Sequence, residues 1–391
     1  MVALSEIIVG ANAERSRSHN RQMVLGRVRA AGEIGRAEIA KVSGLSTQAV
    51  SNIIADLLQD DLIVETGRRT AGRGLPAVQY ALNPLGGFAA GVEIRSDAVF
   101  AALLDLCGNT LASQRTVLKA LDRKTVTQTV VNVQKKLLTK TKAPKDRLLG
   151  AGIVMPGPFG PTGLRGSRSD GPIWDDIAPD LWFADTLGIP VAVENDANAA
   201  AIAERISGVA QGLDTYAFIY FGSGLGLGAV HKGRIISGAF GNAGEIGHIP
   251  VTSDGKTRLL EDVVSRFSVQ RALAKEGIDV DSGDDLDRLY QQNHPILESW
   301  LDAAIEPLSA AITIIENLLD PQAIILGGAM PDSILEHFVQ SVRPSDHSVS
   351  NRMDRGGPRV LRGASGRMTA TLGAAALVIN QAFTPKISAQ L

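Results

Sequence analysis

From Gly86 to the C-terminus, short apolar segments of strand length alternate with helical segments, and glycine-rich turns separate them. Three segments at the start, 91–94, 99–106 and 110–117, predict a meander of strands, and a helix over 126–138 and a buried strand over 148–155 follow. The pattern recurs after Asn195 as a helix (197–206), two strands (216–220 and 226–231), a helical block (259–319) and a further strand (323–326). Alternation of this kind predicts an α/β fold, and its recurrence favours two related lobes.

The first 85 residues have a different pattern, in which three helices are expected. Apolar residues at helical spacing predict helices over 22–31 and 36–42. After a Ser-Gly turn, Ser46 is placed to cap a third helix. The apolar side of the third helix is formed by Val50, Ile53, Ile54, Leu57 and Leu58. Its opposite side is polar and consists of Thr47, Gln48, Ser51 and Asn52.

A basic hairpin is expected after the third helix. Strands over 62–65 and 77–81 enclose a loop over 66–76, which has no acidic residue and carries Arg68, Arg69 and Arg73. Helix, short helix, turn, helix and basic hairpin is the order of a winged helix-turn-helix, whose third helix enters the major groove of DNA. Gln48 and Asn52 suit adenine edges, and the arginines suit phosphates or a minor groove. A solvated helix face and a charged loop are the alternative interpretation.

Charge and cysteine content narrow the class of protein. The 391 residues carry a formal net charge of −2, which excludes a uniformly basic nucleic-acid binder. Residues 1–85 contain 10 Lys and Arg against 8 Asp and Glu, so DNA affinity is expected to depend on dimerisation. The single Cys107 excludes an intramolecular disulfide framework and a multi-cysteine metal site. With no signal-peptide-like start and no apolar run of about 18 residues, a cytoplasmic protein is expected.

Short motifs in the N-terminal region carry a resemblance to a known family. They are Ala37-Glu38-Ile39-Ala40, Gly44-Leu45-Ser46, Val50-Ser51 and Gly72-Arg73-Gly74-Leu75-Pro76. Together they resemble the DNA-binding domain of repressors of the ROK family, which comprises repressors, open reading frames and sugar kinases. Asn52 departs from this family, whose repressors often carry Arg there, and Gly74-Leu75 is an addition before Pro76.

The remainder of the chain carries sugar-site motifs of the same family. These are Met155-Pro156-Gly157-Pro158, Glu194-Asn195-Asp196 and Gly244-Glu245-Ile246-Gly247-His248. Asn195 and Asp196 stand where a strand ends and a helix begins, the usual place for a ligand in an open α/β sheet. The resemblance implies that sugar hydroxyls are bound by Gly157, Asn195, Asp196, Glu245, His248 and Glu261. Carboxylates and amides satisfy hydroxyls, which both donate and accept hydrogen bonds. Taken alone, the Glu245 and His248 pair is also compatible with an ordinary glycine-rich turn.

Two segments depart from the family. ROK members usually carry a cysteine-rich zinc loop after Gly-His, but residues 249–258 contain no cysteine, so no metal is expected. The family's kinases carry an Asp-x-Gly-Gly-Thr turn for ATP phosphates, where this chain reads Glu93-Ile94-Arg95-Ser96-Asp97. Loss of both glycines and the charge of Asp97 predict that ATP binding is lost. Glycines in 221–228 and 326–328 resemble the other nucleotide loops but also suit close lobe packing.

The expected architecture is a winged helix-turn-helix over 1–82, a linker over 83–87 and a two-lobed, actin/hexokinase-like sugar-kinase fold over 88–391. The expected function is a sugar-responsive transcriptional regulator, a repressor without enzymatic activity or cofactor. Its expected partners are palindromic operator DNA, a sugar or sugar-derivative effector and further copies of the chain in a homodimer or homotetramer, but not a membrane. The alternative is an active ATP-dependent sugar kinase with a DNA-binding arm, in which Asp196 is the catalytic base.

Overall fold

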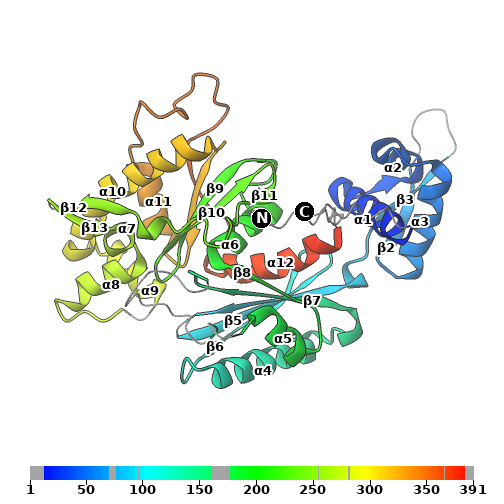
Figure 1. The fold of residues 1–391 in the computed structure, drawn as a ribbon, viewed down its shortest axis with the longest axis horizontal. Coiled ribbons are helices and arrows are strands. Elements are labelled where there is room, and N and C mark those ends of the chain that lie inside the picture. Colours follow the sequence, from blue (N-terminus) through cyan, green and yellow to red (C-terminus); the bar gives the residue numbers. More distant parts are fainter. Residues whose placement is uncertain are drawn as a thin grey trace, which may run out of the picture.

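The computed structural model describes residues 13–69, 76–95, 97–159, 174, 177–253, 255–280, 282–364 and 366–383. A small N-terminal domain lies at one end of the molecule, and two lobes, each built on a five-stranded sheet, form the rest (Figure 1). Among these described residues, no helix is long and apolar enough to cross a membrane.

The N-terminal domain packs three helices against a small sheet of order β1-β3-β2. Its elements are α1 (Ala13–Ala31), β1 (Ile34–Gly35), α2 (Arg36–Ser43), α3 (Thr47–Gln59), β2 (Ile63–Arg69) and β3 (Ala77–Leu82). As expected, Ser46 caps α3, and its side chain accepts a hydrogen bond from the Ala49 amide. Helix α1 begins well before the expected start at Gln22, because the polar residues of its first turns give no apolar periodicity in the sequence.

The hairpin differs from the sequence prediction in the position of two arginines. Strand β2 continues to its end at Arg69, where Arg68 pairs with Val78 and Arg69 with Ala77. The expectation that both lie in the loop is therefore wrong. A bulge between Glu65 and Gly67 lets the ladder continue through a polar stretch with little strand signal of its own. Arg73 lies outside the described residues.

The first lobe contains a sheet of order β6-β5-β4-β7-β8, and the second contains a sheet of order β11-β10-β9-β14-β15. In both sheets the first three strands are antiparallel and the last three are parallel, so the two lobes share one topology. The first lobe comprises β4 (Phe88–Ile94), β5 (Ala98–Asp105), β6 (Thr110–Val117), α4 (Arg123–Thr141), η2 (Lys145–Arg147), β7 (Leu148–Met155), α5 (Pro179–Leu187) and β8 (Val191–Asn195).

The second lobe follows with several helices on its outer side (Figure 1). It comprises α6 (Asp196–Ser207), β9 (Tyr216–Phe221), β10 (Leu225–His231), β11 (Arg234–Ile235), η4 (Ile246–His248), β12 (Pro250–Ser253), β13 (Lys256–Leu259), α7 (Leu260–Val263), α8 (Arg266–Ala274), α9 (Gly283–Gln291), α10 (Pro295–Leu319), β14 (Ile324–Gly328), α11 (Asp332–Ser341), β15 (Val360–Arg362) and η5 (Gly366–Met368). The expected helical block thus divides into separate helices, because Ser265 and Ser282 each cap a new one.

Helix α12 (Thr369–Phe383) lies between the sheets and crosses α6 (Figure 1). Its approach requires residues without side chains. A β-carbon on Gly91 would lie 2.1 Å from the Thr371 carbonyl oxygen, and one on Gly373 would lie 1.8 Å from the Ala199 carbonyl oxygen. Both distances are far below contact distance, so α12 is seated directly on β4 and on α6.

The C-terminal half of α12 also packs against the N-terminal domain. Ala375, Val378, Ile379 and Phe383 belong to the same apolar core as Val24, Val28, Ile54 and Leu57. The Arg29 guanidinium lies 4.8 Å from the centroid of the Phe383 ring. Between the domain and the first lobe, residues 84–86 form a single 3-10 turn, η1. The limits of the domains and the linker stay a prediction.

Candidate functional site

The candidate sugar site begins where β8 runs into α6. Asn195 caps this helix, and its Oδ1 accepts hydrogen bonds from the amides of Ala197 at 2.8 Å and Asn198 at 3.4 Å. The Oδ1 of Asp196 accepts from the Ala197 amide at 2.8 Å. Two polar side chains are therefore fixed at the carboxyl edge of the first sheet, where the sequence predicts them.

Gly157 and Glu245 approach this helix start from two other segments. A β-carbon on Gly157 would lie 2.5 Å from Glu245 Oε1 and 3.1 Å from Asn195 Nδ2. The Nε2 of His248 lies 3.9 Å from Glu245 Oε2. The His248 Nδ1 is buried and has no hydrogen-bond partner among the described residues. Gly157, Asn195 and Glu245 thus lie against one another, with His248 beside Glu245.

Glu261 completes the group from the start of α7. Its Oε2 would lie 2.7 Å from a β-carbon on Gly224 and 3.0 Å from one on Gly247. Gly222 precedes Gly224 in the loop after β9, and a β-carbon on Gly222 would lie 3.4 Å from Asp196 Oδ2. Glycines at these positions let three carboxylates approach the backbone. The structure therefore brings all six predicted site residues together, and their roles stay a prediction.

The electrostatics of the site favour partial protonation. Burial, followed by the negative charge of Glu93, raises the pKa of Asp196 to about 7, against the opposing effects of the Ala197 amide and Arg95. Burial also raises the pKa of Glu245, with a further contribution from Glu261, while His248 lowers it. Near neutral pH the group can thus donate as well as accept hydrogen bonds. This mixture suits a ligand with several hydroxyls.

The segment that the family resemblance equates with the kinase phosphate turn contains a buried hydrogen-bond network. Glu93 is 2% exposed and accepts hydrogen bonds from Arg95 Nε at 2.6 Å, the Tyr220 hydroxyl at 3.0 Å and the Thr371 hydroxyl at 2.7 Å. Burial alone would lower the pKa of Arg95, but the negative charge of Glu93 and its hydrogen bond to Arg95 outweigh burial and raise that pKa. Tyr220 and Thr371 were missed by sequence analysis, and no local motif marks them.

Asp97 takes no part in the hydrogen bonds of this network. It is exposed and forms an ion pair of 3.1 Å with Arg115.

Where the family resemblance places a zinc loop, β12 and β13 form a two-stranded hairpin. Within the described ranges, no group of three or more His, Cys, Asp or Glu side chains is arranged to hold a metal ion.

The polar side of α3 faces solvent in the N-terminal domain. Thr47, Gln48 and Asn52 are exposed, whereas Ser51 is half-buried and donates a hydrogen bond to the Thr47 carbonyl. The Gln48 amide donates to Asn52 Oδ1 at 3.1 Å, so the two amides are linked. Arg68 and Arg69 are both exposed, on consecutive positions of β2. Consecutive strand residues point to opposite faces, so the two arginines cannot contact one surface equally.

Fold and site define a two-lobed protein of the sugar-kinase type with an N-terminal helical arm. Residues 89–381 match the ROK family. The chain belongs to the ROK family.

Three similar proteins illustrate the range of this family. The xylose repressor of Bacillus spizizenii is 24% identical over 340 residues, which cover 85% of this chain and 87% of that protein. The crystal structure of a ROK family transcriptional regulator, a homologue of the E. coli MLC protein, is 25% identical with a TM-score of 0.73 and covers 94% of this chain and 98% of the other. A glucokinase from Streptomyces griseus in complex with glucose and AMPPNP shares the fold, with 23% identity and a TM-score of 0.59, over 74% of this chain and 99% of the other.

Proposed function

We propose that this protein is a cytoplasmic, sugar-responsive transcriptional repressor in which the sugar-kinase fold binds an effector without phosphorylating it. One observation carries the proposal. The regulator structure matches 94% of this chain, whereas the glucokinase structure matches 74% although nearly all of the glucokinase is covered. A transcriptional regulator therefore accounts for most of the chain, whereas a glucokinase leaves about a quarter of it unmatched.

The site chemistry supports binding of a sugar or sugar derivative. Asn195, Asp196, Glu245, His248 and Glu261 offer amide, carboxylate and imidazole groups around one place, with the Gly157 backbone at its edge. A polyol would satisfy the buried His248 Nδ1 and the carboxylates together. The proposed DNA contacts are Thr47, Gln48, Ser51 and Asn52 of α3 with Arg68, Arg69 and Arg73 of the hairpin. The proposed operator is a palindrome read by a homodimer or homotetramer.

Loss of kinase activity is supported by the environment of Glu93. Kinases bring backbone amides of small residues close to phosphates. Here the corresponding segment carries Arg95, whose guanidinium donates hydrogen bonds to Glu93 and to the Arg367 carbonyl at 3.0 Å. Arg95 is not a small residue, so this segment lacks the feature that lets a phosphate approach the backbone.

An active sugar kinase with a DNA-binding arm is the second candidate, and Asp196 favours it. A pKa of about 7 is suited to a general base at neutral pH. The two candidates differ in turnover, because only a kinase would release ADP from ATP in the presence of a sugar and lose that activity in Asp196→Ala.

The test uses the full-length protein. A binding duplex is selected from a randomised pool, and fluorescence anisotropy then follows binding with and without a panel of monosaccharides that includes xylose and glucose. We expect one sugar to lower DNA affinity by roughly 5- to 150-fold, and the duplex to lower affinity for that sugar by the same factor. His248→Ala should bind DNA normally without responding. Selection of no duplex, or Asp196-dependent ADP release, would contradict the proposal.

A further inference from the structure

Four arginines gather beside the candidate sugar site, on the side of the Glu93 network. We call Arg95, Arg115, Arg266 and Arg367 the arginine cluster. The guanidinium carbons of Arg95 and Arg115 lie 4.1 and 5.7 Å from the centroid of the same Phe100 ring. The Nη2 of Arg95 donates to the Arg367 carbonyl at 3.0 Å. Arg95, which follows β4, thus lies beside Arg115 of β6 and the backbone of η5.

Arg266 joins the cluster from the first turn of α8. The amide of its neighbour Phe267 donates to the Ser223 carbonyl at 3.2 Å, so this turn is seated on the loop after β9. The preceding residue of that loop, Gly222, adjoins Asp196. Burial, and then the positive charge of Arg95, lowers the pKa of Arg266, and Arg367 and Arg115 act in the same direction while Asp97 opposes them. Arg266 therefore lies within electrostatic reach of the other three arginines, beside the loop that carries Gly222.

The acidic partners of two of these arginines are weakly held. Arg115 is 50% exposed and Asp97 61%, while Arg367 is 52% exposed and its partner Asp284 74%. Exposed pairs of this kind contribute little free energy, so an incoming anion with a higher charge can replace the carboxylates. Arg95 differs, because its partner Glu93 is buried and remains in place. A dianion that binds here would therefore lose little ion-pair energy when it displaces Asp97 and Asp284.

Resting on the proposed function, we propose that the arginine cluster binds the phosphate group of a phosphorylated sugar whose hydroxyls are held by Asn195, Asp196 and Glu245. A phosphate ester on the hydroxyl next to Asp196 would point along the Gly222 loop toward Arg266. Guanidinium groups are suited to phosphate, because their planar N–H groups bind two oxygens at once. The effector would then be a sugar monophosphate, and the cluster would distinguish it from the unmodified sugar.

Titration calorimetry on the full-length protein tests this with matched pairs of probes: glucose with glucose 6-phosphate, xylose with xylose 5-phosphate, and N-acetylglucosamine with its 6-phosphate. In at least one pair the ester should bind about 10-fold or more tightly than the parent sugar. Inorganic phosphate should compete with the ester and not with the parent sugar.

Variants locate the phosphate. Arg266→Gln should weaken ester binding about 10-fold or more and change binding of the parent sugar less than about 2-fold. Arg367→Gln, at a more exposed position, should act in the same direction if Arg266→Gln impairs folding, and thermal melting without ligand checks both variants. Arg271→Gln is the matched control, since it lies on the same helix in an exposed pair with Asp262 at 2.9 Å.

Two results would overturn the inference while leaving the proposed function intact. One is that in no pair the ester binds more tightly than its parent sugar, and the other is an equal effect of Arg266→Gln and Arg271→Gln on the ester. Failure of every sugar and every ester to bind would overturn the proposed function, and this inference with it.

Discussion

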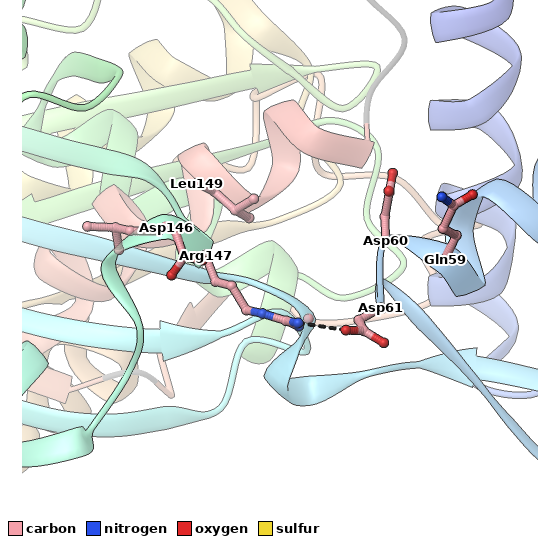
Figure 2. A pocket seen from close by; sticks show the side chains of 8 residues that line it. Gln59, Asp60, Asp61, Asp146, Arg147 and Leu149 are labelled. Carbon is pink, nitrogen blue, oxygen red and sulfur yellow. Dashed lines mark hydrogen bonds and ion pairs between the residues drawn. The ribbon is translucent and has the colours of Figure 1, made fainter.

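The Arg147 guanidinium of the first lobe lies 2.6 Å from the Asp61 carboxylate of the N-terminal domain, and Figure 2 shows the two side chains meeting across a cleft of about 380 Å³. Arg147 also donates to the Leu85 carbonyl at 3.3 Å, so it contacts the turn that joins domain and lobe. A polar contact and the apolar core on α12 therefore fix the domain at two separate places.

Removal of the Arg147–Asp61 ion pair should alter the response of DNA binding to the effector more than the stability of the fold. Asp61 is 56% exposed and Arg147 35%, so Asp61→Asn should lower the free energy of unfolding by about 1 kcal/mol or less. The fold-change in DNA affinity caused by the effector should fall, because the domain is less firmly oriented by the lobe. Urea denaturation and anisotropy measure the two effects. Asp354→Asn, which removes another exposed pair at 2.9 Å, should leave the fold-change unaltered.

Gln48 and Asn52 should read DNA as a unit. Their hydrogen bond at 3.1 Å orients both amides, so Gln48→Ala also releases Asn52. Each single variant should lower discrimination against a mismatched base pair by about 1–3 kcal/mol, and the double variant should lose less than the sum. Competition between selected and scrambled duplexes measures discrimination. Strict additivity would show that the two amides act separately.

Arg68 and Arg69 should contribute unequally to DNA binding. They occupy opposite faces of β2, where Arg68 shares the face of its partner Val78 and Arg69 that of Ala77. Only one of the two arginines should therefore contact DNA phosphates. Its replacement by alanine should weaken binding to all duplexes and reduce the slope of log affinity against log salt concentration by about one. Replacement of the other arginine should have little effect. Anisotropy titrations across a salt series decide this. Equal losses would place both arginines on the DNA.

Asp196 should make the protein less stable as pH rises. Its pKa is raised to about 7 in the folded protein, against about 3.9 for an unfolded aspartate. Its contribution is therefore fully present below about pH 4 and is lost as pH rises through about 7. The Asp196→Asn variant cannot ionise at this position. As pH rises between these limits, its free energy of unfolding should therefore increase by on the order of 1–3 kcal/mol relative to the unaltered protein. Denaturation curves across this range measure the difference, and the exposed Asp185→Asn should show none.

A methyl group at Gly157 should disrupt the candidate sugar site. Its carbon would lie 2.5 Å from Glu245 Oε1, so Glu245 or Asn195 must move. Gly157→Ala should weaken effector binding by about 10-fold or more, and DNA binding without effector should be unchanged. Gly356→Ala provides the control, because a β-carbon there meets no atom within 4 Å. If calorimetry shows unchanged effector affinity in Gly157→Ala, the effector binds elsewhere than at this site.

Local sequence patterns predict much of this fold. The uninterrupted apolar run of β7 predicts Leu148–Met155 to the residue, and Ser46 marks the start of α3. The extent of β2 is not predictable in this way, because pairing with β3 draws Arg68 and Arg69 into the ladder. Family motifs identify the residues around Gly157, but the partners of Glu93 have no motif. Tyr220 and Thr371 stand 127 and 278 residues from it, and only the folded chain brings them together.

Through the close contact of Gly373 with Ala199, α12 connects the candidate sugar site with the N-terminal domain. Its fifteen residues span about 22 Å, at about 1.5 Å per residue. Near its start it touches α6, whose first residues border the candidate sugar site, and at its end Phe383 touches Arg29 of α1. Because no side chain separates the two helices at the crossing, a tilt of about 5° at Gly373 would move Phe383, about 15 Å farther along α12, by about 1.3 Å.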